Sequence, residues 1–243
     1  VNNGDVVKYD KLVIASGAVP KELPSSKGIG NAFVLRQPVD ANAIRQAANN
    51  SDSVVIIGGG YIGLEVAASL RKKGMDITVI EAGERILARV ASKPLAEYLN
   101  KLHEDNGVTV ITNVGVEGIN QEAGIFNNVT LSDGRIIKGD MLITGIGVYP
   151  DSQLASDAGL ETQFDNGGAI LVDNDMRTSD EDIFAIGDVA IRREQTNAVE
   201  SVHNAQETAA IAAASITGAN RPNTQTPWFS SDQDDAKLQS VGI

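Results

Sequence analysis

Three glycines at fixed spacing are the strongest chemical feature of the sequence. Gly58-Gly59-Gly60-Tyr61-Ile62-Gly63 matches G-x-G-x-x-G, follows an apolar run over 53–57 and precedes an amphipathic stretch over 64–73. In this pattern the glycines allow a tight turn, close approach of a diphosphate to the backbone, and close packing of helix on strand. Free amides at the positive end of the helix then attract phosphate. The pattern predicts a dinucleotide site; the alternative is a glycine turn of an α/β fold that holds no nucleotide.

An acidic residue follows at the expected distance. Glu81 lies 18 residues after Gly63, at the end of an apolar run over 76–80. Its carboxylate is suited to accept hydrogen bonds from both ribose hydroxyls of an adenosine, and together with Glu84 it would repel a 2′-phosphate. The sequence therefore favours NAD(H) over NADP(H), with Arg85 as the one residue that could weaken this preference.

Glu65 lies at the start of the predicted helix and has two interpretations. It is either a polar contact near the nicotinamide end of the dinucleotide or a favourable charge at a helix N-terminus. The spacing alone does not decide between them.

A second group of candidates lies in the last third of the chain. A strand over 183–186 ends on Gly187-Asp188, where a carboxylate could bind a polyol or simply belong to a strand-to-loop turn. Glu200–Asn204 precedes an alanine-rich helix over 205–216, whose N-terminus could stabilise negative charge on a ligand. Trp228-Phe229 is either core or an aromatic wall over a planar ligand. We interpret His203 as a helix-start residue and His103 as structural.

The elements around these residues indicate an α/β fold. Strand 53–57, helix 64–73 and strand 76–80 form a βαβ unit, with Ile62, Val66 and Leu70 as one buried stripe. The other predicted elements are strand 11–16, loop 19–30, extended segment 32–35, a helix with Asp40 as N-cap, helix 93–104, strand 108–112, hairpins over 114–137, strand 140–146 and strand 170–173.

The two ends of the sequence predict a piece of a longer protein. A turn at Asn2–Asp5 and an extended stretch over 6–9 resemble part of a hairpin. The strand-like stretch 237–243 has nothing after it to pair with.

Composition excludes several classes of function. Among 243 residues, 20 Lys and Arg stand against 32 Asp and Glu, and the formal charge of −12 argues against a non-specific nucleic-acid binder. The absence of cysteine excludes disulfides, thiolate metal sites and redox cysteine pairs, and two histidines are too few for a His-rich metal cluster. No apolar run reaches the roughly 18 residues of a membrane span, and no signal peptide is visible, so we expect a cytoplasmic protein.

The sequence resembles the FAD-dependent pyridine nucleotide oxidoreductases, the two-dinucleotide-binding flavoproteins. Within them it is most similar to the NADH-dependent ferredoxin reductases of bacterial oxygenase systems, the putidaredoxin reductase group, which is related to apoptosis-inducing factor. The matching segments, in the family's order, are Tyr9–Gly17 (YDKLVIASG), Leu35-Arg36, Gly58–Glu65 (GGGYIGLE), Glu81, Ile86–Val90 (ILARV), Gly145–Val148 (GIGV), Gly187-Asp188, Glu200–Val202 (ESV) and Pro227–Gln233 (PWFSSDQ).

The resemblance implies a role for each matching residue. NAD(H) would contact Gly58, Gly59, Gly60, Tyr61, Ile62, Gly63, Glu65, Glu81, Gly145, Ile146 and Gly147. FAD would contact Ala15, Ser16, Gly17, Arg36, Gly187, Asp188, Ser201, Val202 and Trp228. Asp188 would bind the ribitol, Val202 would face the flavin pyrimidine, and Trp228 would lie near the flavin. Ser16 stands where the family usually has threonine, and the family's own FAD glycine motif would precede this chain.

The implied fold is an NAD-binding Rossmann-like domain inserted in a partial FAD-binding one. The expected boundaries are 1–37 and 151–222 for the FAD-binding domain, 38–150 for the NAD(H)-binding domain, and 223–243 for the start of a C-terminal domain. The implied reaction is hydride transfer from NADH to FAD, followed by electron transfer to a small iron–sulfur ferredoxin that serves an oxygenase. Arg71, Lys72 and Lys73 are a candidate docking patch for that acidic partner.

Two other interpretations stay open. One is another flavoenzyme of this fold, such as an NADH oxidase, a nitrite reductase component or an apoptosis-factor-like oxidoreductase. The other is an NAD-binding module that does not retain FAD and is not an enzyme as it stands. The sequence predicts no metal site and does not specify an oligomeric state.

Overall fold

The computed structural model describes residues 4–164, 167–219, 221–222 and 226–242. It divides into two units. Unit 1 is formed by the residues up to Val19, by Tyr149–Ser230 and by the residues from Gln239 on; unit 2 is formed by Pro20–Val148 and Ser231–Leu238. Part of the predicted turn at 2–5 lies outside the described residues, and residues 6–9 form no strand.

Unit 2 is built on a parallel sheet with the order β3-β10-β4-β5-β6. The strands are β3 (Ala32–Phe33), β4 (Ser53–Ile57), β5 (Asp76–Ile80), β6 (Val108–Ile111) and β10 (Met141–Thr144). In register, Val55 lies opposite Thr78 on one side and Leu142 on the other. The chain proceeds from β4 through β5 to β6 and then returns to the other side of β4, so β4 and β10 flank the point where the strand order reverses.

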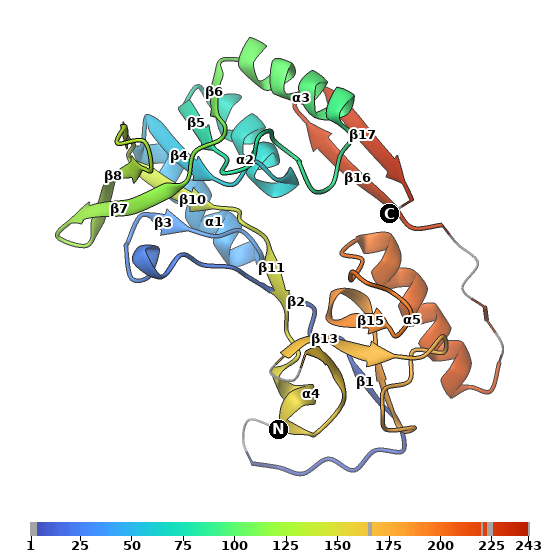
Figure 1. Ribbon diagram of the computed structural model, residues 1–243. Helices are drawn as coiled ribbons and strands as arrows, with labels where there is room; N and C mark the ends of the chain where they lie inside the picture. Colours follow the sequence, from blue (N-terminus) through green and yellow to red (C-terminus); the bar gives the residue numbers. More distant parts are fainter. Residues whose placement is uncertain (1–3, 165–166, 220, 223–225, 243) are drawn as a thin grey trace. The chain divides into compact units, whose positions relative to one another are not determined.

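The two faces of this sheet are covered by different layers (Figure 1). Helices α1 (Pro38–Ala47), α2 (Tyr61–Arg71) and α3 (Lys93–Asp105) pack with Val54 and Ile56 of β4. An antiparallel sheet of β7 (Val116–Glu122), β8 (Ile125–Leu131) and β9 (Ile136–Lys138) packs with Val55 and Ile57 instead. Because side chains alternate along a strand, the continuous apolar run of β4 supplies both cores.

The helix starts differ from the predicted ones. The predicted N-cap Asp40 is wrong: α1 begins at Pro38 with Gln37 as its N-cap, and Asp40 accepts a hydrogen bond from the Gln37 amide at 2.7 Å as the third residue of a capping box. Proline is favoured at a first helical position because its missing N–H has no intrahelical partner there.

The predicted stripe on α2 is wrong at one position. The helix begins at Tyr61, inside the glycine motif, and Ile62 is 42% exposed while Val66 and Leu70 are buried. In this first turn Gly63, not Ile62, faces β4, since a Cβ on Gly63 would lie 3.4 Å from the side chain of Ile56. The same Cβ would lie 2.2 Å from the Gly58 carbonyl oxygen.

Unit 1 joins short strands to one long helix. β1 (Leu12–Ile14) pairs in parallel with β14 (Ile183–Ala185), and β12 (Thr162–Phe164), β13 (Gly167–Val172) and β15 (Ala190–Arg192) form a second sheet. Helices α4 (Gln153–Asp157) and α5 (Val202–Ile216) complete the unit. Helix α5 begins three residues before the predicted start because Ser201 caps it, its hydroxyl oxygen accepting from the Asn204 amide at 3.1 Å.

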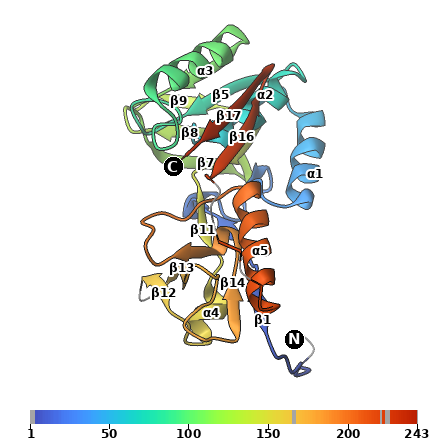
Figure 2. The same cartoon turned by 90° about the vertical axis from the view of Figure 1, so that its right-hand side faces the viewer.

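Two strand pairs lie where the chain passes from one unit to the other (Figure 2). β2 (Ala18–Pro20), in the segment predicted as a loop, pairs with β11 (Val148–Pro150). β16 (Trp228–Gln233) pairs with β17 (Ala236–Val241), so the last strand-like segment finds its partner in the residues before it. The remaining short elements are 3₁₀ turns η1 (Pro24–Ser26), η2 (Ala48–Asn50) and η3 (Gly187–Val189). No helix among the described residues is both long and apolar enough to span a membrane.

Candidate functional site

The glycine turn of unit 2 has the shape that its sequence predicts. Gly58 follows β4 with a φ of +108°, a conformation that side chains disfavour. A Cβ at Gly58 would lie 2.3 Å from the Gly145 carbonyl oxygen. The turn therefore tolerates no side chain at Gly58 or Gly63, and both glycines serve the close packing of backbone on backbone.

Gly60 meets a different environment. A Cβ built on Gly60 would have no neighbour closer than 3.9 Å, so its surroundings are open. Gly60 is the N-cap of α2, and no side chain caps this helix end. Open space beside uncapped amides at the positive end of a helix is the environment that a diphosphate requires. The residues present thus fit a dinucleotide.

Glu81 holds the turn from the adjacent strand. One carboxylate oxygen accepts a hydrogen bond from the Gly59 amide at 2.8 Å, and the other accepts from the Gly83 amide at 2.7 Å. Each carboxylate oxygen has a second lone pair, so the half-buried side chain retains the capacity to bind a ribose hydroxyl. Leu87 adds a bond from its amide to the Gly59 carbonyl oxygen at 2.9 Å. The ILARV segment, Ile86–Val90, therefore stabilises the glycine turn through this hydrogen bond.

Arg85 is engaged with its own loop. Its guanidinium donates to the carbonyl oxygens of Ile86 and Leu87 at 3.4 Å and of Ala88 at 3.2 Å. These contacts use donors that a 2′-phosphate would need. Beside the turn, burial raises the pKa of the Tyr61 phenol above its usual value of 10.0, so this side chain is neutral at pH 7.

The segment after β10 lies against the same turn. The Gly145 amide donates to the Ile57 carbonyl oxygen at 2.8 Å, and the Gly147 carbonyl oxygen accepts from the Lys21 amide at 2.9 Å. In an open parallel sheet, ligands bind beyond the carboxyl ends of the strands where the order reverses. The structure therefore brings together the glycine turn, Glu81 and Gly145–Gly147 at one edge of the unit 2 sheet.

Unit 1 gathers most of the second set of predicted residues. Ala15–Gly17 follows β1 and Gly187-Asp188 follows β14, and the Ile186 amide donates to the Ile14 carbonyl oxygen at 3.1 Å. The Gly187 amide also donates to the Thr208 hydroxyl on α5 at 3.0 Å. These bonds place the half-buried Asp188 beside the first turns of α5, where Ser201 caps the helix and Val202 is 76% exposed.

Trp228 lies near the same helix start, with its ring centroid 5.4 Å from that of His203. The side chain is 39% exposed and is not a core residue. Arg36 belongs to unit 2, where its amide donates to Asp40 at 2.9 Å, and is not among the residues that unit 1 brings together.

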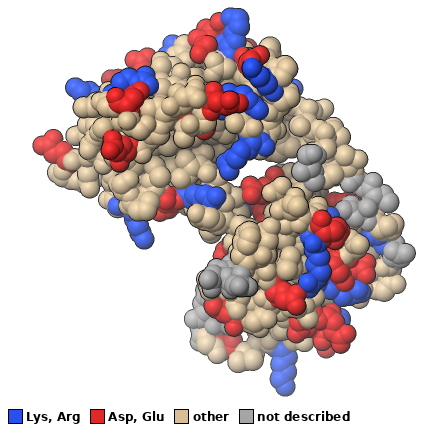
Figure 3. Space-filling view, viewed as in Figure 1, with Lys and Arg blue, Asp and Glu red and all other residues tan. Residues whose placement is uncertain are grey.

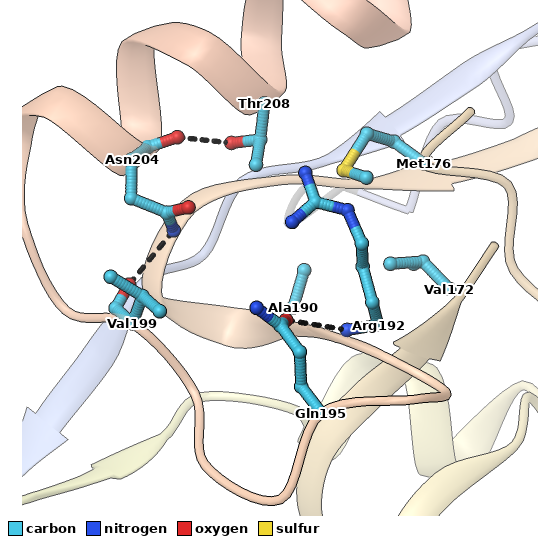
Figure 4. Close-up of a pocket in the computed structure, with 8 residues that line it drawn as sticks. All are labelled: Val172, Met176, Ala190, Arg192, Gln195, Val199, Asn204 and Thr208. Atoms are coloured by element: carbon cyan, nitrogen blue, oxygen red, sulfur yellow. Dashed lines mark hydrogen bonds between the residues drawn. The ribbon is translucent and has the colours of Figure 1, made fainter. Parts of the chain in front are cut away.

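A small cavity lies in unit 1 (Figure 4). Its volume is about 10 Å³, enough for one water molecule. The buried Arg192 extends toward it, and Asn204 and Thr208 of α5 line it. Among the described residues, no group of three His, Asp or Glu side chains could hold a metal ion.

The docking patch of Arg71, Lys72 and Lys73 stays a prediction, and two of its three residues also have partners within unit 2. Arg71 donates to the carbonyl oxygens of Asn106 at 2.8 Å and Met75 at 2.9 Å, and Lys72 pairs with Asp234 at 2.9 Å. Both side chains hold the fold of unit 2. The face drawn in Figure 3 shows acidic and basic side chains interspersed within each unit, without a single extended basic area.

One set of contacts to Glu65 was not predicted from the sequence. Ser231 donates to a carboxylate oxygen of Glu65 at 2.5 Å, and Gln233 donates to the Ser231 hydroxyl at 2.8 Å. Both residues lie in the PWFSSDQ segment, of which only Trp228 was given a role. Both residues lie in a uniformly polar run, so no pattern in the sequence marks them as buried.

Comparisons with known proteins agree with this architecture. A family model described as pyridine nucleotide-disulphide oxidoreductase matches residues 1–209. A "probable ferredoxin reductase CtmF" from Castellaniella defragrans is 43% identical over 244 residues, which cover 98% of this chain and 58% of that protein. The chain thus spans less than two thirds of this relative.

Two solved structures are also similar. The ferredoxin reductase for the CYP199A2 system from Rhodopseudomonas palustris has a TM-score of 0.94 and 36% identity, covering 99% of this chain and 60% of that one. The reductase chain matched in a covalent putidaredoxin reductase–putidaredoxin complex has a TM-score of 0.92 and 37% identity, covering 99% and 59%.

Proposed function

Because the chain belongs to the pyridine nucleotide-disulphide oxidoreductases, we propose that it is the larger part of an NADH-dependent ferredoxin reductase. In this proposal residues 38–150 hold NAD(H), and residues 1–37 with 151–222 contribute to an FAD site. Residues 223–243 begin a further domain, and the cytoplasm stays the predicted compartment.

The open space at Gly60 carries the NAD(H) assignment. Uncapped amides of α2 face this space, so they are placed to bind a diphosphate. Glu81 is expected to accept from the adenosine ribose, and Glu84 with Glu81 disfavours a 2′-phosphate. Glu65 is expected to lie near the nicotinamide, where a carboxylate oxygen can accept from the N–H of a carboxamide.

Unit 1 fits the proposed FAD site by the chemistry of its residues. Asp188 supplies a carboxylate for ribitol hydroxyls, and the N-terminus of α5 supplies a positive partial charge beside the exposed Val202. FAD, when bound, supplies the chemistry that links a two-electron hydride donor to a one-electron acceptor. The protein's part is to bind and orient the reactants, and no side chain is required as acid or base.

The names of similar proteins support a small iron–sulfur ferredoxin as the acceptor, since one is a reductase in covalent complex with putidaredoxin and two are ferredoxin reductases. A ferredoxin is usually acidic, as is this chain, so docking requires a local basic surface. Arg71, Lys72 and Lys73 stay the candidate for that surface, with Arg71 and Lys72 also paired within unit 2.

Three measurements test the proposal. Titration calorimetry with NADH and NADPH should give heat with NADH and much weaker binding of NADPH; a folded sample that gives no heat with NADH contradicts it. Absorbance near 450 nm after FAD addition and desalting should reveal bound flavin, whereas a colourless protein that binds NADH would support the non-catalytic alternative. Given bound flavin, cytochrome reduction that requires ferredoxin separates a ferredoxin reductase from an NADH oxidase or another flavoenzyme.

A further inference from the structure

The hairpin of β16 and β17 carries polar side chains into the core of unit 2. Ser231 is 3% exposed and Gln233 is 0% exposed, although both lie on a two-stranded hairpin with polar outward positions. Burying a polar side chain is unfavourable unless it finds partners. The partners of these two residues therefore indicate why the hairpin is polar on its inner face.

Four side chains from three elements form one hydrogen-bonded series. The Ser231 hydroxyl lies 2.5 Å from Glu65 Oε1, on the first turns of α2. Gln233 Nε2 lies 2.8 Å from Ser231 Oγ and 3.4 Å from the Tyr61 carbonyl oxygen. Gln233 Oε1 lies 2.8 Å from Nε2 of His103, which is 1% exposed on α3.

Glu65, at the end of the series, determines which group donates in each hydrogen bond. A carboxylate only accepts, so Ser231 donates its proton to Glu65. The Ser231 oxygen then accepts from the Gln233 amide group, and the Gln233 carbonyl oxygen accepts from N–H at His103 Nε2. Burial lowers the pKa of His103 below its usual value of 6.5, so the ring is neutral at pH 7. Its remaining proton is assigned to Nε2 because the atom opposite, Gln233 Oε1, can only accept. All donors in the series thus point toward Glu65.

This arrangement leaves Glu65 with one fixed and one available oxygen. Oε1 is held by Ser231, while Oε2 accepts no hydrogen bond from any residue that the structure describes. The side chain is half-buried, so it is both restrained and accessible. A ligand group that donates N–H would find an acceptor already oriented, which lowers the entropy cost of binding.

We propose that Ser231 and Gln233 are positioning residues that orient Glu65 toward the carboxamide of a nicotinamide dinucleotide. The proposal rests on the proposed binding of NADH to unit 2. It assigns to the C-terminal hairpin a share in the specificity of the nucleotide site.

The test compares two adjacent serines. Ser231→Ala removes the buried hydroxyl, while Ser230→Ala removes an exposed one and serves as the matched control. By titration calorimetry, S231A should bind NADH about tenfold more weakly than the wild type, the effect of losing one hydrogen bond to a charged group. S230A should bind as the wild type does. Binding of ADP-ribose, which lacks nicotinamide, should be the same in all three proteins.

A double-mutant cycle with Glu65→Ala separates the possible failures. We expect E65A to weaken NADH binding and S231A to have no further effect in the E65A background. If E65A weakens NADH binding and S231A does not, the positioning role is wrong while the NADH site stands. If S231A weakens ADP-ribose as much as NADH, its role is only structural. A wild-type chain that binds neither ligand contradicts the proposed function itself.

Discussion

At the scale of single residues, the glycines of the turn meet two different requirements, close packing of the backbone and open space for a ligand. Gly58 and Gly63 pack against backbone oxygens, whereas the space beside Gly60 is open. Gly58 and Gly63 serve the fold, whereas Gly60 is proposed to leave room for the ligand. This difference allows folding and binding to be altered independently.

We predict that Gly60→Ala reduces NADH affinity without loss of stability. Gly60 has a φ of −82° and a ψ of 178°, which alanine adopts without strain, but its methyl group would occupy space proposed for the diphosphate. Affinity should fall at least tenfold by calorimetry, with an unchanged Tm.

Gly63→Ala should instead lower Tm, because its methyl group would lie 2.2 Å from a carbonyl oxygen. Gly115→Ala, with no neighbour closer than 3.9 Å, is the control for both variants and should change neither property. Equal NADH affinity of G60A and the wild type would contradict the assignment of the open space.

His103 gives the molecule a predicted pH dependence. Burial lowers the pKa of His103 in the folded state below the usual 6.5, although the Gln233 hydrogen bond opposes this shift. The unfolded chain therefore binds more protons as the pH falls through 6.5, and stability decreases in that direction.

We expect the Tm of the wild type to fall between pH 7.5 and pH 5.5 by more than that of His103→Asn, which cannot take up the proton. A variant H103N with the same pH profile as the wild type would show that burial of His103 does not affect stability in this range.

At the scale of elements, short-range patterns predicted most of unit 2. The βαβ unit follows from apolar runs and glycines that are close in sequence. The start of α1 was misplaced because Gln37 is a weaker capping signal than Asp40, and the outcome depended on Pro38. The series from Glu65 to Ser231 joins residues 166 positions apart, and no local pattern specifies such a contact.

The Asp140 carboxylate connects the beginning of β4 to the beginning of β10 through hydrogen bonds. Asp140 accepts from the amides of Asp52 at 3.0 Å and Ser53 at 2.9 Å and from the Ser53 hydroxyl at 2.8 Å. The Ser53 hydroxyl, together with these amides, holds the pKa of Asp140 below its usual 3.8. The charged Asp140 stabilises the folded protein fully above pH 3.8, its usual pKa. This stabilisation is lost as the pH falls through the lower pKa that Asp140 has in the folded state.

We therefore predict that Asp140→Ala lowers Tm by about 3 °C at pH 7 and that the difference shrinks toward pH 2–3. Thermal unfolding at both pH values measures it. A difference that is constant with pH would contradict the role of the charged form.

At the scale of the whole molecule, the division into two units predicts a local response to ligand. NADH at about one hundred times its Kd stabilises the form that binds it by about 2.7 kcal/mol. In hydrogen exchange, we expect protection of amides in 58–63, 81–88 and 145–147 of unit 2.

Strands β13 and β15 of unit 1 should exchange at an unchanged rate, and G60A should show no protection at the same NADH concentration. Protection of unit 1 alone would contradict the proposed assignment of the nucleotide to unit 2.

The contact between Gly58 and Gly145 has a consequence for how the motif is understood. The carbonyl oxygen of Gly145, just after β10, closes one side of the turn at Gly58, although the two glycines are separated by nearly ninety positions. A synthetic peptide of residues 53–80 would contain every letter of the motif and would lack that oxygen, as well as the carboxylate that grips the Gly59 amide. The shape of the glycine turn therefore depends on the assembled sheet. An isolated peptide would keep the sequence motif and lose the binding site.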